Sequence, residues 1–159
     1  MENEIENMVL ALAERLQAAG QMVTCAESCT GGWIAKAMTD MAGSSSWFER
    51  GFVTYSNQSK QEMLGVSPET LREHGAVSRE TVLEMAMGAL ANSAAQFSVA
   101  VSGVAGPGGG TPEKPVGTVW LAWSGSHFTD AVCKHFDGDR ETVRKATVHA
   151  ALHGLLERL

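Results

Sequence analysis

Short strand-like runs alternate with helical patterns along this chain, and that alternation constrains the fold more than any other feature of the sequence. Around these runs, apolar side chains recur at every third or fourth position, which is typical of helices. Residues 5–16 show this spacing, and Gly20 marks the expected end of that helix. This order predicts an α/β fold, a three-layer sandwich around a mixed, partly parallel sheet. The strand-like runs are residues 22–25, 51–55, 97–102, 118–123 and 128–136.

The length of 159 residues predicts a single domain over residues 1–159, with enough chain to bury most of its apolar surface in one core. The last two strand-like runs are joined by a short turn, which predicts an antiparallel hairpin. Helices are expected over residues 5–19, 33–41, 57–64, 67–74, 78–94 and 139–159, with Asn57, Ser78 and Asp139 as N-cap residues. The inner face of the last helix is expected to comprise Val143, Ala146, Ala150 and Leu155.

The charge pattern excludes several classes of partner. The chain carries 12 basic against 18 acidic residues, a formal net charge of -6, and the basic residues are scattered. Binding to nucleic acid or to an anionic membrane depends on basic patches, so neither partner is expected. No apolar run approaches the ~18 residues of a membrane span, and the acidic N-terminus is unlike a signal peptide. These features predict a cytoplasmic protein.

The cysteines and histidines show no metal-binding or disulfide pattern. Three cysteines, an odd number, do not make a disulfide framework, so reduced and buried thiols are expected. His149 and His153 are four residues apart on the last predicted helix, but no third ligand pattern accompanies them. We therefore expect a packing or surface pair of histidines and no metal.

Three segments rich in glycine and hydroxyl side chains directly follow predicted strands. They are residues 25–32, 55–60 and 102–110. In open α/β sheets, ligands bind at the carboxyl ends of the strands. If the three strands are parallel neighbours, the segments face one crevice, and that crevice is the expected site.

The first of these segments contains candidate nucleophiles. In VTCAESCTGGWIAKAM, residues 23–38, the hydroxyls of Ser28 and Thr30 and the thiols of Cys25 and Cys29 lie at a strand-to-helix turn. The free N–H groups and the dipole of the following helix can stabilise an oxyanion there. Small residues are also common in turns without chemistry, and the run lacks the Gly-x-Ser-x-Gly pattern, so the pattern alone leaves both interpretations open.

A serine nucleophile needs a base, and no histidine of this chain lies in a glycine-rich turn. Lys60, five residues after Tyr55, can serve if burial keeps its amine neutral and the Tyr55 hydroxyl orients the proton. The alternative for Lys60 is an exposed position on a helix. The loop 103–117 can cradle a phosphate through backbone N–H groups or be a surface loop, and Arg140 can bind a phosphate or remain solvated.

Four motifs of the chain, taken together and in this order, resemble one family, the CinA C-terminal domain family. The resemblance covers nearly the whole chain and is closest to the stand-alone nicotinamide-nucleotide amidases. Ser102 and Val104 depart slightly, since Thr and Ile are expected at these positions in many relatives. The motifs are TCAESCTGG at residues 24–32, ERGFVTYSNQSK at 49–60, GAVS at 75–78 and SGVAGPGGGTPEKPVGTVW at 102–120.

The resemblance implies hydrolysis of the carboxamide of nicotinamide mononucleotide to nicotinate mononucleotide and ammonia, in the recycling of pyridine nucleotides towards NAD. It implies Ser28 as nucleophile, Lys60 as base and Tyr55 as its partner, with no metal and no cofactor. It also suggests a homodimer. The alternatives are a non-catalytic regulatory module that binds pyridine nucleotides, and a hydrolase that uses the thiol of Cys25 or Cys29.

The expected substrate contacts come from the same segments. Backbone N–H groups near residues 29–31 or 102–103 are the candidate oxyanion donors. The glycines of residues 106–110 and Arg140 are the candidates for the ribose phosphate. Glu27 holds Lys60, faces the pyridinium, or is an ordinary exposed glutamate. The full set of expected substrate-binding residues is Glu27, Cys29, Thr30, Gly31, Ser102, Gly103, Gly106, Gly108, Gly109 and Arg140.

Overall fold

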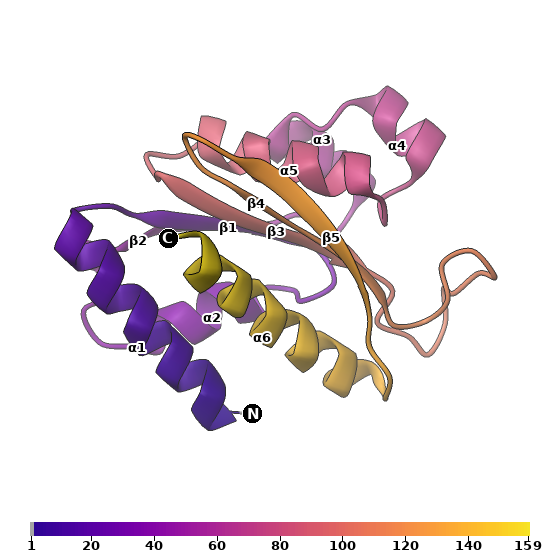
Figure 1. Cartoon of the computed structure of the whole chain (residues 1–159). Coiled ribbons are helices and arrows are strands. Elements are labelled where there is room, and N and C mark those ends of the chain that lie inside the picture. Colours follow the sequence, from indigo (N-terminus) through magenta and orange to yellow (C-terminus); the bar gives the residue numbers. More distant parts are fainter. Residues whose placement is uncertain (1) are drawn as a thin grey trace.

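A five-stranded mixed sheet forms the centre of the computed structural model, which describes residues 2–159 (Figure 1). The strand order is β2-β1-β3-β4-β5, with β1 parallel to β2 and to β3, and with antiparallel pairing of β3 with β4 and of β4 with β5. The predicted sheet type and the predicted hairpin are therefore confirmed. The strands are β1 (Val23–Glu27), β2 (Phe48–Val53), β3 (Phe97–Gly103), β4 (Thr118–Ser124) and β5 (Thr129–His135).

Helices cover both faces of this sheet. Helices α1, α2 and α6 pack on one face, while α3, α4 and α5 lie on the other (Figure 1). Each helical layer buries its own apolar cluster against the sheet, so the predicted three-layer sandwich is confirmed. None of the helices within residues 2–159 is long and apolar enough to cross a lipid bilayer. The helices are α1 (Glu2–Ala19), α2 (Trp33–Thr39), α3 (Asn57–Leu64), α4 (Pro68–His74), α5 (Arg79–Ala91) and α6 (Arg140–Arg158), with a short 3-10 turn η1 (Ser44–Ser46) before β2.

The alternation of side chains along β1 and β3 determines which residues face which helices. Cys25 and Val99 belong to the cluster under α1 and α6, whereas Ala26 and Ala100 belong to the cluster under α5. Ala26 and Ala100 are opposite each other in the register, so a row of small side chains lies beneath α5. At the end of β1, the same alternation directs Glu27 toward the layer of α2.

Several element boundaries differ from the sequence prediction. The strand predicted at residues 51–55 is β2, which begins earlier and ends at Val53. The N-cap of α3 is Ser56 rather than Asn57, because the Ser56 hydroxyl accepts from the Ser59 N–H and the Ser59 hydroxyl accepts from the Ser56 N–H. Ser78 and Asp139 are confirmed as N-cap residues of α5 and α6.

The inner face of α6 was predicted only in part. Val143 and Leu155 are buried as expected, but Ala146 and Ala150 are only half-buried. The helix instead buries a stripe rotated slightly from the predicted one, because α6 packs against α1 as well as against the sheet. The additional buried residues of this stripe are Thr147, Val148, Ala151, Leu152 and Gly154.

Candidate active site

The carboxyl ends of β1, β2 and β3 meet at one edge of the sheet, as the sequence predicts, since the three strands are parallel neighbours. A cavity of about 300 Å³ lies there and receives residues from all three of the segments singled out in the sequence. Its lining residues are Ser28, Cys29, Tyr55, Asn57, Lys60, Ala76, Val77, Ser102, Gly103, Val104, Ala105, Gly106, Gly108, Gly109 and Arg140.

Lys60 and Ser28 form the chemical centre of this cavity. The Lys60 Nζ lies 3.0 Å from the Ser28 Oγ and also donates to the Thr54 carbonyl at 2.8 Å and to the Tyr55 carbonyl at 3.5 Å. Only 1% of the Lys60 surface is exposed, so the alternative of a solvated helix lysine is wrong. Burial lowers the pKa of the Lys60 ammonium from 10.5 to about 8. A substantial fraction of the amine is therefore neutral in mildly alkaline solution, as a general base requires.

The local structure explains how a lysine comes to be buried at this point. The capping box at Ser56 starts α3 immediately after the β2 segment, and Lys60 lies on its first turn. A helical side chain leans toward the N-terminus of its helix, which directs the Lys60 amine back to the carbonyls of the preceding turn. All three hydrogen-bond partners are neutral oxygens, so none of them holds the ammonium form by charge.

Ser28 is fixed by its backbone immediately after β1. Its N–H donates to the Val101 carbonyl of β3 at 3.1 Å, and its carbonyl accepts from the Gly31 N–H at 3.1 Å. Gly31 and Gly32 have positive φ angles of 60° and 106°, which lets the chain turn sharply from strand to helix. The hydroxyl side chain faces the layer of α3, where Lys60 lies, on the opposite side of the sheet from Glu27.

Glu27 does not hold Lys60 and is absent from the lining of the cavity, so the geometry gives no support to the expected contact of Glu27 with the substrate. Its buried carboxylate accepts from the Thr30 hydroxyl at 2.6 Å and from the N–H groups of Ile34 and Ala35 at 2.8 and 2.9 Å. It therefore compensates the N-terminal N–H groups of α2. The reason is the strand alternation, which directs two consecutive residues, Glu27 and Ser28, to opposite faces of the sheet.

The thiols are poor nucleophiles in this environment. Burial raises the pKa of Cys29 to about 11, and burial together with the Glu27 carboxylate raises the pKa of Cys25 well above its usual range. Both thiols are therefore protonated near neutral pH, which favours the Ser28 hydroxyl. Cys133 lies on β5 and is exposed, contrary to the expectation that the thiols are buried.

Tyr55 lies at the mouth of the cavity with 62% of its surface exposed. The Tyr55 hydroxyl accepts from the Arg140 Nη2 at 3.1 Å. The Lys60 amine contacts the carbonyl of Tyr55 and not its hydroxyl. The Arg140 Nη1 donates to the Gly106 carbonyl at 2.8 Å. Arg140 thus connects the start of α6 to both the β2–α3 segment and the glycine-rich loop.

The glycine-rich loop after β3 lies against the cavity with defined backbone contacts. The Val104 N–H donates to the Thr118 carbonyl at 2.9 Å, and the Val104 carbonyl accepts from the Gly117 N–H at 2.7 Å. A Cβ at Gly106 would lie 2.5 Å from a Val116 methyl, so this position admits only glycine. Of the residues predicted to bind substrate, Ser102, Gly103, Gly106, Gly108 and Gly109 line the cavity, together with Cys29 and Arg140.

Thr30 and Gly31 lie on the other side of the Ser28 turn, outside the cavity. They border a separate hollow with Arg144, and the Thr30 hydroxyl is occupied by Glu27. Sequence reasoning missed Arg144, although its position four residues after Arg140 places both on the same face of α6. It also gave no role to the Thr54 carbonyl, Asn57 or Val77, although these residues lie within the motifs at 49–60 and 75–78.

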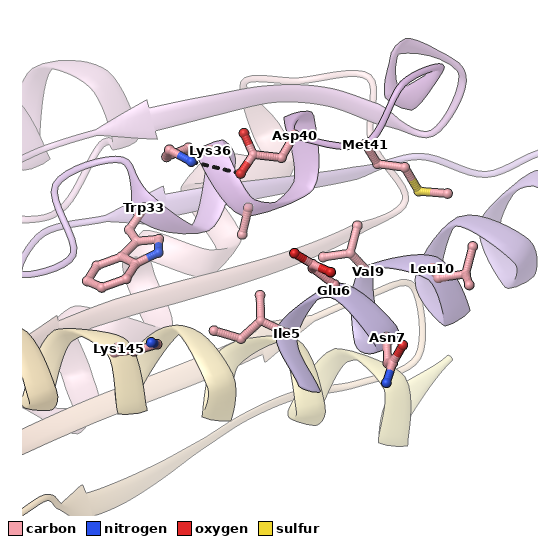
Figure 2. Close-up of a pocket in the computed structure, with 11 residues that line it drawn as sticks. Ile5, Glu6, Asn7, Val9, Leu10, Trp33, Lys36, Asp40, Met41 and Lys145 are labelled. Carbon is pink, nitrogen blue, oxygen red and sulfur yellow. Dashed lines mark hydrogen bonds and ion pairs between the residues drawn. The ribbon is translucent and has the colours of Figure 1, made fainter. Parts of the chain in front are cut away.

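A larger cavity, of about 590 Å³, lies between α1, α2 and α6 and includes Trp33, Lys36 and Lys145 (Figure 2). None of the residues predicted for the site lines it, and the Lys36 amine is paired with Asp40 at 2.8 Å. Elsewhere on the chain, His149 lies 2.7 Å from the Glu4 carboxylate and His153 lies 3.1 Å from that of Glu157. Within residues 2–159, no three metal-ligating side chains gather to hold a metal ion.

Comparisons with known proteins agree with this geometry. The family model described as the CinA C-terminal domain matches residues 5–159. Nicotinamide-nucleotide amidohydrolase PncC of Escherichia coli (strain K12) is 51% identical over 99% of this chain and 96% of its own length, and PncC of Pseudomonas putida is 55% identical over 96% of each. The crystal structure of competence/damage inducible protein CihA from Agrobacterium tumefaciens superposes with a TM-score of 0.94 at 49% identity, covering 97% of this chain and 94% of that one. With its motifs, fold and strand-end cavity in agreement, the chain belongs to the CinA C-terminal domain family.

Proposed function

We propose that this chain hydrolyses the carboxamide of nicotinamide mononucleotide, releasing nicotinate mononucleotide and ammonia in the recycling of pyridine nucleotides. The observation that carries the proposal is the buried Lys60 amine 3.0 Å from the Ser28 hydroxyl. The names of the relatives supply the substrate, because PncC proteins more than half identical to this chain are nicotinamide-nucleotide amidohydrolases. The Ser28–Lys60 pair supplies a chemistry suited to an amide, namely acyl transfer through a serine ester.

In the proposed reaction, neutral Lys60 takes the Ser28 proton while the Oγ bonds to the amide carbon. The resulting tetrahedral oxyanion collapses, the carbon–nitrogen bond breaks, and the Lys60 ammonium returns the proton to the leaving nitrogen, which departs as ammonia. Water then gives a proton to Lys60 and attacks the ester. Collapse of this second intermediate breaks the bond to the Ser28 oxygen, which takes the Lys60 proton, and releases the carboxylic acid, which loses its proton to solvent as the carboxylate.

Gly103 is the backbone donor that we assign to the oxyanion. The Val101 carbonyl accepts from the Ser28 N–H, so the backbone polar groups of Val101 point toward β1. Backbone groups alternate in direction along a strand, so the N–H of Gly103, two residues later, points to the same side. On that side the Ser28 carbonyl accepts from the Gly31 N–H, so we expect the Gly103 N–H to be available to an oxyanion beside the nucleophile. A Cβ at Gly103 would lie 2.6 Å from a Val119 methyl and 2.8 Å from the Thr118 carbonyl, so the packing of β3 against β4 requires glycine at this position.

Arg140 and the loop glycines are assigned to the phosphate of the substrate. The two hydrogen-bond partners of Arg140, the Gly106 carbonyl and the Tyr55 hydroxyl, are neutral oxygens, so its charge is available to an anion at the cavity mouth. Tyr55 contributes its carbonyl to Lys60 and its hydroxyl to Arg140. We therefore propose that Tyr55 links the base to the phosphate-binding arginine instead of relaying the proton.

The experiment that tests the function is ammonia release from nicotinamide mononucleotide by the purified protein after treatment with a chelator. Stoichiometric ammonia and nicotinate mononucleotide support the proposal. Tight binding of the nucleotide without any product would instead identify the chain as a regulatory binding module and overturn the proposal.

The pH dependence of the reaction is expected to follow the ionisation of Lys60. Because the neutral amine is the base, kcat/KM should rise about tenfold per pH unit below the pKa of about 8 and level off above it. Initial rates of ammonia release from pH 6 to 10 measure this profile. A profile that is flat between about pH 6 and 9 would show that Lys60 is not the base.

We also propose that the chain acts as a cytoplasmic homodimer. Trp47 and Trp123 are buried, whereas Leu10, Val53, Met63 and Met87 are exposed large apolar side chains. Sedimentation equilibrium should give twice the chain mass of 16.9 kDa. A mass of one chain at micromolar concentration would contradict the dimer.

A further inference from the structure

Arg144 lies outside the cavity and binds the turn that carries Ser28. Its Nε donates to the Cys29 carbonyl at 3.1 Å, and its Nη2 donates to the Thr30 carbonyl at 3.0 Å. The guanidinium also lies 5.5 Å from the centroid of the Trp33 ring, which projects from α2 toward α6 (Figure 2). One arginine of α6 therefore contacts two consecutive peptides of the nucleophile turn and the first residue of the helix that follows it.

Glu27 holds the same segment through a different set of groups. Its carboxylate accepts from the Thr30 hydroxyl and from the N–H groups of Ile34 and Ala35. In the segment from residue 28 to residue 35, two early carbonyl oxygens therefore bind the Arg144 cation. Two later N–H groups bind the Glu27 carboxylate. Because each peptide group is planar, fixing the oxygens of Cys29 and Thr30 also fixes the directions of the N–H groups that follow them.

The turn needs such contacts because its sequence is permissive. Gly31 and Gly32 both adopt positive φ angles, and glycine at these positions restricts the chain less than any other residue. Ser28 must nevertheless keep its hydroxyl 3.0 Å from the Lys60 amine. Displacements of about 1 Å in catalytic geometry are enough to lower a rate about a hundredfold.

We propose that Arg144 is a positioning residue for the reaction, acting on Ser28 through the carbonyl groups of Cys29 and Thr30. Arg144 is absent from the lining of the cavity that contains Ser28, so its effect passes through the turn. A planar guanidinium can bridge two carbonyl oxygens, whereas the compact ammonium of a lysine cannot reproduce this fork. The inference rests on the proposed amidase function and adds a determinant of its rate.

The test compares Arg144→Met and Arg144→Lys with the matched control Arg158→Met. Arg158 makes comparable contacts at the other end of α6, since it donates to the Gly154 carbonyl at 2.9 Å, lies 4.0 Å from the Trp123 centroid and pairs with the Asp130 carboxylate at 2.9 Å. Arg144→Met should lower kcat about 10- to 100-fold with KM changed less than about threefold. Arg144→Lys should recover part of the loss, and Arg158→Met should keep kcat despite a similar fall in thermal midpoint.

Two outcomes overturn the positioning role. One is a kcat for Arg144→Met equal to that of Arg158→Met, and the other is a raised KM at unchanged kcat, which would mark a substrate contact instead. A second readout separates this inference from the proposed function. A fluorophosphonate probe bonds to the Ser28 Oγ with loss of fluoride, and its labelling rate, followed by intact mass, does not depend on the nucleotide. If the wild-type protein releases no ammonia, the proposed function fails, and equal labelling rates for Arg144→Met and Arg158→Met then overturn the role of Arg144.

Discussion

Replacing Ser28 with alanine is expected to lower ammonia release from nicotinamide mononucleotide at least about a thousandfold. The substitution removes the one atom that the proposed reaction bonds to the amide carbon. It leaves the backbone contacts of the turn in place, because these use the Ser28 N–H and carbonyl. Initial rates, together with the thermal midpoint, measure the two effects separately.

Two further variants test whether the loss of activity is specific to the Ser28 hydroxyl. Ser124→Ala removes a similarly buried hydroxyl from the opposite end of the sheet and should retain full turnover. Cys29→Ala should retain most of the activity, since the raised pKa of Cys29 keeps this thiol protonated. An active Ser28→Ala protein together with an inactive Cys29→Ala protein would transfer the nucleophile to the thiol.

Replacing Lys60 with methionine is expected to lower turnover about a hundred- to ten-thousandfold, which is the usual contribution of a general base. Methionine fills nearly the same space without an amine, so the loss reports the proton transfer and not a collapse of the cavity. Lys36→Met is the matched control, because Lys36 is exposed and paired only with Asp40. Turnover of Lys60→Met at the wild-type rate would exclude Lys60 as the base.

The same variant should be more stable than the wild type in neutral solution. The pKa of Lys60 falls from 10.5 to about 8 on folding, so between these values the unfolded chain binds more protons and the free energy of unfolding rises with pH. Below pH 8 the buried ammonium opposes folding by on the order of 3 kcal/mol, and Lys60→Met removes this cost. Urea unfolding should show an advantage for the variant that is largest below pH 8 and shrinks toward about pH 10.5. An advantage that does not vary with pH would contradict the burial of a titrating amine.

The location of the site could be predicted from the sequence because it depends on topology. Strand-like runs that end in glycine and hydroxyl residues imply that these ends meet wherever the strands are parallel neighbours. The order β2-β1-β3 fulfils that condition and brings Ser28, Lys60 and Ser102 to one cavity.

The directions of individual side chains could not be predicted in the same way. Glu27 and Ser28 are adjacent in the motif, and only the observed end of β1 shows that they face opposite sides of the sheet. Tyr55 likewise follows β2 by two residues, and its hydroxyl reaches Arg140 because α6 begins nearby. Such contacts depend on where a helix distant in the sequence packs, which local patterns do not encode.

The contribution of α6 to this site has a consequence for how the protein matures. The proposed nucleophile and the proposed base lie within the first 60 residues, but the arginines that contact their segments lie at positions 140 and 144. During synthesis the N-terminal part of a chain emerges and begins to fold first. Partly synthesised chains can therefore contain both reacting groups without the contacts that complete the site. If Arg140 and Arg144 act as proposed, activity is expected only after the last helix has docked, and it would then report that the whole domain has folded.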